Sequence, residues 1–235
     1  GQLVGDVVNG GLATSDTWRD LSVPGGFTVR DVKAASGVSL NNIDDGISLL
    51  DGGLASSGET TAFFGTINLH DDVEGASGNF GKEDAFPNGV QGVYDDDFAV
   101  RATGALVVGE EDEGWWTFGV SSDDGFRLGI EDAEFTDWAG ASGTSIVDGE
   151  LLYYNPRGAT DSLGHIYLEE GVYDLTLEFF ERAGGANVEL YYSAGIHSAF
   201  NGSFALLVPE PASTLLLLVG GLVLLGARRR RFIAR

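Results

Sequence analysis

One stretch, Gly114–Ile130, limits the fold most strongly, because its apolar residues alternate with small or polar residues in two short runs. The apolar positions of the two runs are Trp116, Phe118, Val120, Phe126, Leu128 and Ile130. A period of two residues is the pattern of a β-strand with one buried face. Between the runs, Asp123 and Asp124 precede Gly125, and an Asp-Gly pair in this setting is typical of a tight turn. The stretch therefore predicts a compact hairpin with two adjacent carboxylates at its tip.

Similar alternation recurs along most of the chain, with glycine-rich turns between the apolar runs. Glycine makes up 36 of the 235 residues, about twice its usual share of about 7%. Besides the hairpin, we expect strands at residues 27–34, 63–69, 98–108, 146–154, 163–168, 171–180 and 186–192. About nine short strands separated by turns predict an all-β fold, an antiparallel β-sandwich or jelly roll.

A single short helix is expected at residues 42–50. Asn42 suits its N-cap, and Asp44 and Asp45 suit the positive end of the helix dipole. The sequence Asp51-Gly52-Gly53 should end the helix.

Charge and cysteine content exclude several classes of function. All 36 acidic residues lie at or before Glu210, where only 8 of the 13 basic residues are found. Such a surface repels nucleic acid and attracts cations, so we expect no nucleic-acid partner. The chain has no cysteine, which rules out disulfides and thiolate metal sites.

The order of these pieces resembles a known family. The segments GWWTFGV, SSDDGFRL and GVYDLTLEFFERAGGANVELYYS are similar to the β-sandwich first defined in the anthrax protective antigen, the PA-fourteen domain. The resemblance covers roughly Phe27 to Ser193, and it implies an antiparallel sandwich. Its most specific parts are the SDDG turn and the later run that begins at Tyr173 and ends in Gly-Gly-Ala.

The resemblance also implies a binding site. In sugar-binding members, such as the yeast flocculins, paired aspartates joined by a cis peptide coordinate Ca²⁺, an Asn-bearing loop completes the site, and sugar hydroxyls bind the ion. The corresponding ligands here are Asp123, Asp124 and Asn187. Two adjacent carboxylates suit Ca²⁺, which prefers six to eight oxygen ligands. For the exposed aromatic residue of a glycan site, Trp138 and Tyr154 are the candidates, and the alternative is that each belongs to the core. The alternative is that the Asp-Asp-Gly sequence only makes a turn.

No other cluster predicts a site as strongly. Asp95–Asp97, with Asp71 and Asp72, could hold a second Ca²⁺, but the pattern favours a solvated acidic loop. Carboxylate pairs are expected by chance in so acidic a chain, and no nucleophile or nucleotide motif is present. We therefore do not expect an enzyme.

The C-terminal segment has a different character. Its apolar run, Leu215–Ala227, has 13 residues, fewer than the roughly 20 that span a bilayer. The sequence Val-Pro-Glu-Pro, a short apolar helix and an arginine cluster resembles the PEP-CTERM sorting signal. The residues that carry this resemblance are Pro209, Glu210, Pro211, Arg228, Arg229, Arg230 and Arg231. The resemblance implies transient anchoring in the inner membrane, processing by an exosortase, and delivery to the surface or matrix of a Gram-negative bacterium.

Together these patterns divide the chain into three parts. Residues 1–26 form an N-terminal strand or spacer, residues 27–207 the sandwich, and residues 208–235 the sorting signal with a short transmembrane helix. We expect an exported protein of the cell surface or exopolysaccharide matrix that binds glycans, with Ca²⁺ as cofactor. The alternative is a structural or self-assembling matrix protein without a sugar site.

Overall fold

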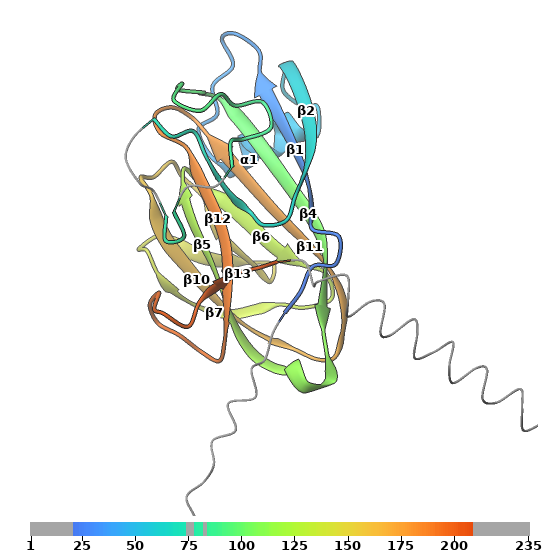
Figure 1. Cartoon of the computed structure of the whole chain (residues 1–235). Coiled ribbons are helices and arrows are strands. Elements are labelled where there is room, and N and C mark those ends of the chain that lie inside the picture. Colours follow the sequence, from blue (N-terminus) through green and yellow to red (C-terminus); the bar gives the residue numbers. More distant parts are fainter. Residues whose placement is uncertain (1–20, 74–77, 82–83, 209–235) are drawn as a thin grey trace, which may run out of the picture.

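The chain folds into two antiparallel β-sheets packed face to face, as predicted (Figure 1). The computed structural model describes residues 21–73, 78–81 and 84–208. The sheets enclose one large apolar core, and a short helix covers part of the outer face of one sheet. The two sheets are called sheet A and sheet B below.

Sheet A has seven strands. In spatial order they are β2 (Ser56–Phe64), β1 (Phe27–Ala34), β4 (Phe98–Val108), β11 (Gly171–Glu181), β6 (Phe126–Ile130), β9 (Glu150–Tyr153) and β8 (Thr144–Val147).

Sheet B has six strands, and β5 lies near its centre. Five follow one another as β13 (Ala205–Leu206), β12 (Asn187–Ala194), β5 (Gly114–Asp123), β10 (Thr160–Leu168) and β7 (Phe135–Gly140), while β3 (Asn68–His70) also pairs with β12. A single turn of 3₁₀ helix, η1 (Glu110–Asp112), leads into β5.

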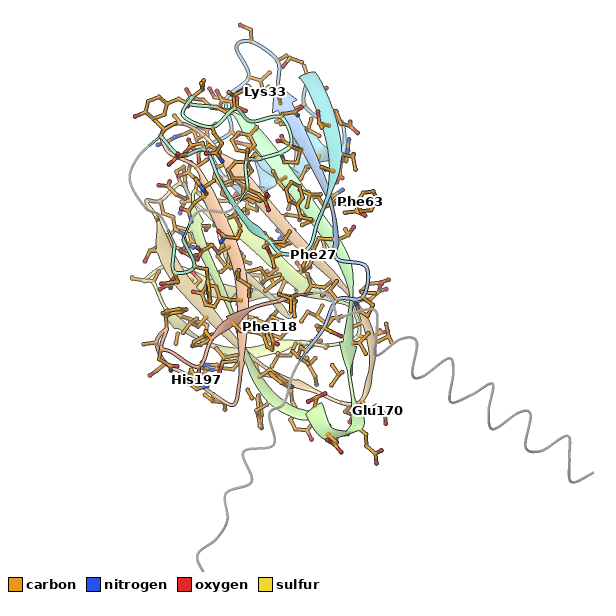
Figure 2. All side chains as sticks on the ribbon, viewed as in Figure 1. Phe27, Lys33, Phe63, Phe118, Glu170 and His197 are labelled. Atoms are coloured by element: carbon orange, nitrogen blue, oxygen red, sulfur yellow. The ribbon has the colours of Figure 1, made fainter. Side chains whose placement is uncertain are left out.

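Alternation along the strands builds the core. Trp116, Phe118 and Val120 point inward from β5 and are fully buried, as their spacing predicts. Figure 2 shows Phe118 and Phe27 within the sandwich, and both have zero exposure. Fully burying each side chain of this size contributes about 1.5–3 kcal/mol, so the core stabilises the fold without disulfides.

The predicted helix is confirmed as α1 (Ile43–Leu50). Asn42 is its N-cap and accepts a hydrogen bond from the backbone N–H of Asp45 at 3.0 Å. The buried face of the helix packs on the outer face of sheet A. The contact is close because Gly46 has no side chain, and a Cβ there would lie 2.7 Å from the Cβ of Phe180.

The predicted hairpin is wrong in one respect, because its two strands do not pair with each other. β5 pairs with β10 and β12 in sheet B, whereas β6 pairs with β11 and β9 in sheet A. Residues Asp123 to Gly125 therefore form an arch that carries the chain from one sheet to the other. The alternation was interpreted correctly, but two inward-facing strands can face each other across a core as well as lie side by side.

Other strand boundaries also differ from the prediction. The strand expected at residues 63–69 is broken, because β2 ends in sheet A and β3 begins in sheet B. Phe63 is consequently 78% exposed and projects from the outer face of sheet A (Figure 2). The strand expected at 146–154 is a hairpin of β8 and β9. β7 was missed because only Phe135 of its six residues is buried.

The ends of the chain fall largely outside the described residues. Leu21 and Val23 are buried in the main core, and Ser22 forms β-bridges with Val107 and Val208, so packing begins before Phe27. The structures expected for residues 1–20 and for the C-terminal helix after Val208 lie outside the described part. Within that part, no helix is long and apolar enough to cross a membrane.

Candidate metal centre

Asp123 and Asp124 lie in the arch between β5 and β6, at one end of the sandwich. The peptide bond between them is cis, as the family resemblance predicted. Gly125 is required next because its backbone packs tightly: a Cβ there would lie 2.6 Å from the carbonyl oxygen of Tyr153 and 2.7 Å from the ring of Phe180. The glycine therefore serves close packing between segments and does not close a hairpin.

Backbone donors hold the carboxylate of Asp124 in place. Its Oδ1 accepts a hydrogen bond from the backbone N–H of Arg157 at 2.7 Å, and its Oδ2 accepts one from the backbone N–H of Arg182 at 2.9 Å. The side chain is only 4% exposed. Burial raises the pKa of Asp124, and these two hydrogen bonds partly oppose that shift.

Asp123 is half-buried beside it. Burial, together with the negative charge of Asp124, raises the pKa of Asp123 to about 7. Two adjacent carboxylates whose pKa values are both raised are stabilised by any cation that binds between them.

A third carboxylate, which the sequence analysis did not assign, belongs to the same cluster. Glu181 is the last residue of β11, and one of its carboxylate oxygens lies within 4.8 Å of an oxygen of Asp123 and of an oxygen of Asp124. The side chain has zero exposure, and neither oxygen has a hydrogen-bond partner. Burial and the nearby charges of Asp124 and Asp123 raise the pKa of Glu181 to about 10. A signal was available, since Glu181 continues the inward-facing series Tyr173, Leu175, Leu177, Phe179.

Asn187 begins β12 and lies directly opposite Asp123 in the β5–β12 pairing. Opposite residues of an antiparallel pair project from the same face with Cβ atoms about 4.5–5.5 Å apart. The Nδ2 of Asn187 donates to the carbonyl oxygen of Ser121 at 3.5 Å, whereas its buried Oδ1 accepts no hydrogen bond. The amide oxygen is thus available as a neutral ligand.

Arg157 stabilises the arch through hydrogen bonds to Ser122. Its guanidinium donates to the carbonyl oxygen and Oγ of Ser122 at 3.2 and 2.7 Å, and to Oγ of Ser162 at 2.8 Å. The charged group lies 4.3 Å from the ring centre of Tyr153. Ser122 in turn donates to the carbonyl oxygen of Asp124 at 2.7 Å. Burial lowers the pKa of Arg157 to about 10, so it stays positively charged at neutral pH.

A cavity of about 270 Å³ opens over the two aspartates. It is lined by Asp123, Asp124, Pro156, Arg157, Gly158, Arg182 and Ala183. Ligand pockets of small molecules start at about 300 Å³, so the space suits a small polar group.

The two aromatic residues predicted to contact a ligand lie outside this lining. Tyr154 is 41% exposed, and its hydroxyl donates to Asp44 of α1 at 3.1 Å. Trp138, 40% exposed on β7, pairs with Gly164 of β10. Gly164 is four residues from Thr160, the position on β10 opposite Ser122, so Trp138 lies about 13 Å further along the strands.

The acids of the long loop serve different purposes. Asp97 accepts a hydrogen bond from the backbone N–H of Leu40 at 2.9 Å, and Asp96 accepts one from Gly184 at 3.2 Å. Asp95 forms an ion pair with Lys33. Among the described residues, the only group of three or more carboxylate or imidazole side chains close enough to share a metal is the one formed by the arch and Glu181.

Comparison with known proteins agrees with this architecture. The family profile of the PA14 domain, written PA-fourteen above, matches residues 59–199, more than half of the chain. The chain belongs to the PA14 domain family. A second profile, the PEP-CTERM protein-sorting motif, matches residues 207–231 of this PA14 protein. Both resemblances drawn from the sequence are therefore confirmed.

Several solved structures are similar to this PA14 domain. The PA14 domain of the MpAFP antifreeze protein is 18% identical with a TM-score of 0.48, and the match covers 80% of this chain and 88% of that one. The PA14 sugar-binding domain of an RTX adhesin is 14% identical with a TM-score of 0.47, and the match covers 78% of this chain and 99% of that one. The A domain of epithelial adhesin 9 from Candida glabrata, in complex with Galb1-4GlcNAc, is 13% identical with a TM-score of 0.45. That match covers 81% of this chain and 91% of that one. No curated protein matches the sequence.

The donor set of the arch fits a hard divalent cation. Three carboxylates and one amide oxygen are all oxygen ligands, and several of these oxygens are buried without a partner. Ca²⁺ is bound by such carboxylate and amide oxygens in flexible geometry, and it tolerates open positions for water or a ligand. The cavity above Asp123 and Asp124 is where such an open position would lie.

Proposed function

We propose that this PA14 domain binds glycans through a Ca²⁺ ion held at Asp123, Asp124 and Asn187. The observation that carries the proposal is the group of three close carboxylates, with the buried unpartnered oxygens of Glu181 and Asn187 among them and an open cavity over the two aspartates. A bound Ca²⁺ would neutralise the carboxylates and leave coordination positions directed into the cavity. Vicinal hydroxyl groups of a sugar are oxygen ligands of the kind such positions accept.

The dimensions of the cavity favour a single sugar residue. About 270 Å³ admits one monosaccharide ring, so we propose recognition of an exposed or terminal residue of a polysaccharide. Gly158 and Arg182 line the cavity and would offer hydrogen-bond donors to the remaining hydroxyls, whereas the guanidinium of Arg157 already donates to Ser122 and Ser162. Trp138 and Tyr154 remain candidates for contacts with neighbouring sugar residues of a longer chain.

The sorting motif supports a location for this activity. A PEP-CTERM motif implies export and processing by an exosortase after transient anchoring in the inner membrane. We propose that the domain acts at the cell surface or in the exopolysaccharide matrix of a Gram-negative bacterium. The large excess of acidic residues is consistent with a soluble, self-repelling exported surface.

Retention on polysaccharide tests the proposal. The full chain should be retained on a column of the matrix exopolysaccharide in 2 mM Ca²⁺ and released by excess EDTA. The Asp123→Asn, Asp124→Asn variant should pass through the column in both buffers. Equal retention of the wild type with Ca²⁺ and with EDTA would refute the proposal.

One observation favours the alternative of a self-assembling matrix protein. β2 is an edge strand of sheet A, mostly exposed on both faces, and Phe63 on it is 78% exposed. Exposed edge strands are templates for pairing with another chain. Under this alternative Phe63→Lys would abolish concentration-dependent association in analytical ultracentrifugation, whereas under the glycan-binding proposal it leaves retention on polysaccharide unchanged.

A further inference from the structure

Of the segments that cross between the two sheets at the end of the sandwich that holds the arch, two meet at the carboxylate cluster. The arch carries the chain from β5 in sheet B to β6 in sheet A, and the turn at residues 182–186 carries it from β11 in sheet A to β12 in sheet B. Hydrogen bonds tie the two crossings together, since Arg182 donates to Asp124 at 2.9 Å and Phe180 donates to the carbonyl oxygen of Gly125 at 3.1 Å. The carboxylate cluster lies at this junction.

Its ligands therefore come from both sheets. Asp123 and Asn187 are the end residues of strands in sheet B, and Glu181 ends a strand of sheet A. Lys33, labelled in Figure 2, lies at the same end of the molecule. It contacts Asp96, and the N–H of the next residue, Asp97, donates to the carbonyl oxygen of Arg182 at 3.2 Å.

Glu181 differs from other buried acids of the described chain. Glu178, three residues earlier on β11, forms hydrogen bonds with Arg101 at 2.8 and 2.5 Å. Glu189 accepts bonds from the backbone N–H groups of Asn79 and Phe80 at 2.6 and 3.0 Å. Glu181 is also buried, yet neither of its oxygens has a hydrogen-bond partner. The other members of its cluster, Asp123 and Asp124, are carboxylates as well and supply no positive charge. Burying such a group without a partner is costly, so a cation is the missing partner.

We infer that a divalent cation at this junction is a clamp between the two sheets, with Glu181 as a third carboxylate ligand from sheet A. The inference rests on the proposed function for the presence of Ca²⁺, and it adds a structural role and a ligand. Glu181 is fully buried and does not line the cavity, so it does not compete with a sugar for the open positions. A divalent cation between three carboxyl groups whose oxygens lie within 4.8 Å of one another is attracted by all three, and it displaces the proton from Glu181. Binding of Ca²⁺ therefore orders both crossings at once.

The variant Glu181→Gln, made in the full chain in mild detergent, tests the clamp. It keeps the size of the side chain and removes its charge. We expect the Kd for Ca²⁺, measured by calorimetry, to rise at least tenfold, while the melting temperature in EDTA stays the same or increases. Glu178→Gln is the matched control on the same strand, and its Kd for Ca²⁺ should equal that of the wild type. A residue with only a packing role would give a lower melting temperature in EDTA and an unchanged Kd.

Hydrogen exchange of the wild type gives a second test that needs no variant. Added Ca²⁺ should slow amide exchange both in the arch, residues 122–126, and around the end of β11, residues 180–187. Protection confined to the arch, or a wild-type Kd for Glu181→Gln, would overturn the clamp and leave the glycan-binding proposal intact. If both crossings are protected but polysaccharide is not retained, the clamp stands and the glycan-binding proposal fails. If the wild type does not bind Ca²⁺, both fail.

Discussion

Two acidic regions lie close together at one end of this sandwich, and they differ in how their carboxylates are satisfied. In the segment Asp95–Asp97, every carboxylate has a partner within the protein. Asp95 pairs with Lys33, and the other two accept backbone hydrogen bonds from the neighbouring chain. These carboxylates need no cation, because each already has a partner in the protein that holds the loop against the sandwich.

The arch region has as many carboxylates but fewer partners. Asp124 is anchored by two backbone donors, whereas both oxygens of Glu181 and the amide oxygen of Asn187 are buried without any. A high density of acidic residues is therefore a weak indication of a cation site. Several buried and unpaired oxygens in one cluster are a stronger indication, because each costs free energy until a ligand supplies the missing interaction.

The largest expected effect is on stabilisation by Ca²⁺. At about 100 times its Kd, a ligand adds roughly 2.7 kcal/mol to the free energy of unfolding. The wild type should gain this amount in Ca²⁺ relative to EDTA, and Asp123→Asn with Asp124→Asn should lose the whole gain while remaining folded. Thermal melts in the two buffers measure the difference.

The other acidic region supplies the control for that experiment. Asp95→Asn with Asp96→Asn removes two charges a short distance away, and it should leave the gain from Ca²⁺ intact. If this control loses the gain while the arch variant keeps it, the contrast between the two regions is reversed.

A second effect on stability is expected from pH in the absence of metal. The folded pKa values of Asp123 and Glu181, about 7 and about 10, lie above their ordinary values of 3.8 and 4.5. The folded state therefore binds more protons than the unfolded state, and stability is lost as pH rises. In EDTA we expect the free energy of unfolding to fall between pH 5 and pH 8, by up to about 1.4 kcal/mol per pH unit from the fully buried Glu181 and by less from the partly exposed Asp123.

Urea titrations at the two pH values measure this change. Ca²⁺ should reverse the trend, since it binds the deprotonated carboxylates and its affinity rises with pH. Stability in EDTA that increases from pH 5 to pH 8 would contradict the burial of unpaired carboxylates.

Truncation of Asp97 should have a modest effect that is independent of Ca²⁺. Asp97→Ala removes the acceptor for the backbone N–H of Leu40, and loss of one such hydrogen bond costs about 1 kcal/mol. The loss should be the same with Ca²⁺ and with EDTA. A loss seen only in Ca²⁺ would mean that the loop region contributes to the cation site.

The smallest effect is expected outside both regions, in the sorting segment. Leu207 is buried and the carbonyl oxygen of Val208 accepts a hydrogen bond from Val23, so the last contacts of the sandwich are made there. Deletion of residues 209–235 should leave the melting temperature nearly unchanged and release the protein from cells. A large drop in melting temperature would show that the segment packs on the domain.

Local patterns predicted much of the fold because they act within one element. The alternation in β1 and β4 and the N-cap of α1 were sufficient to locate these elements. Pairing between elements was harder to predict. The runs on either side of Asp123 look like a hairpin, since a half-buried strand has the same period whether its partner lies beside it or across the core. β2 and β7 were missed or misplaced because exposed edge strands lack alternation.

The sequence motif predicted the two aspartates of the site but not the buried Glu181. Asp123 and Asp124 stand out as adjacent acids, and the family resemblance pointed to their cis peptide. Glu181 lies 57 residues later in an alternating strand, where sequence alone does not show that its carboxylate meets theirs. Its position at the end of the inward-facing series was the available clue: a charged residue in a core position requires a partner.

Diffraction from a crystal grown with Ca²⁺, with anomalous data collected at a long wavelength, shows whether the carboxylate cluster holds the ion. We expect an anomalous peak between the carboxylates of Asp123, Asp124 and Glu181, with oxygen ligands at about 2.3–2.6 Å and an open position facing the cavity. Absence of a peak there at millimolar Ca²⁺, with Glu181 satisfied by a protein donor, would contradict this expectation.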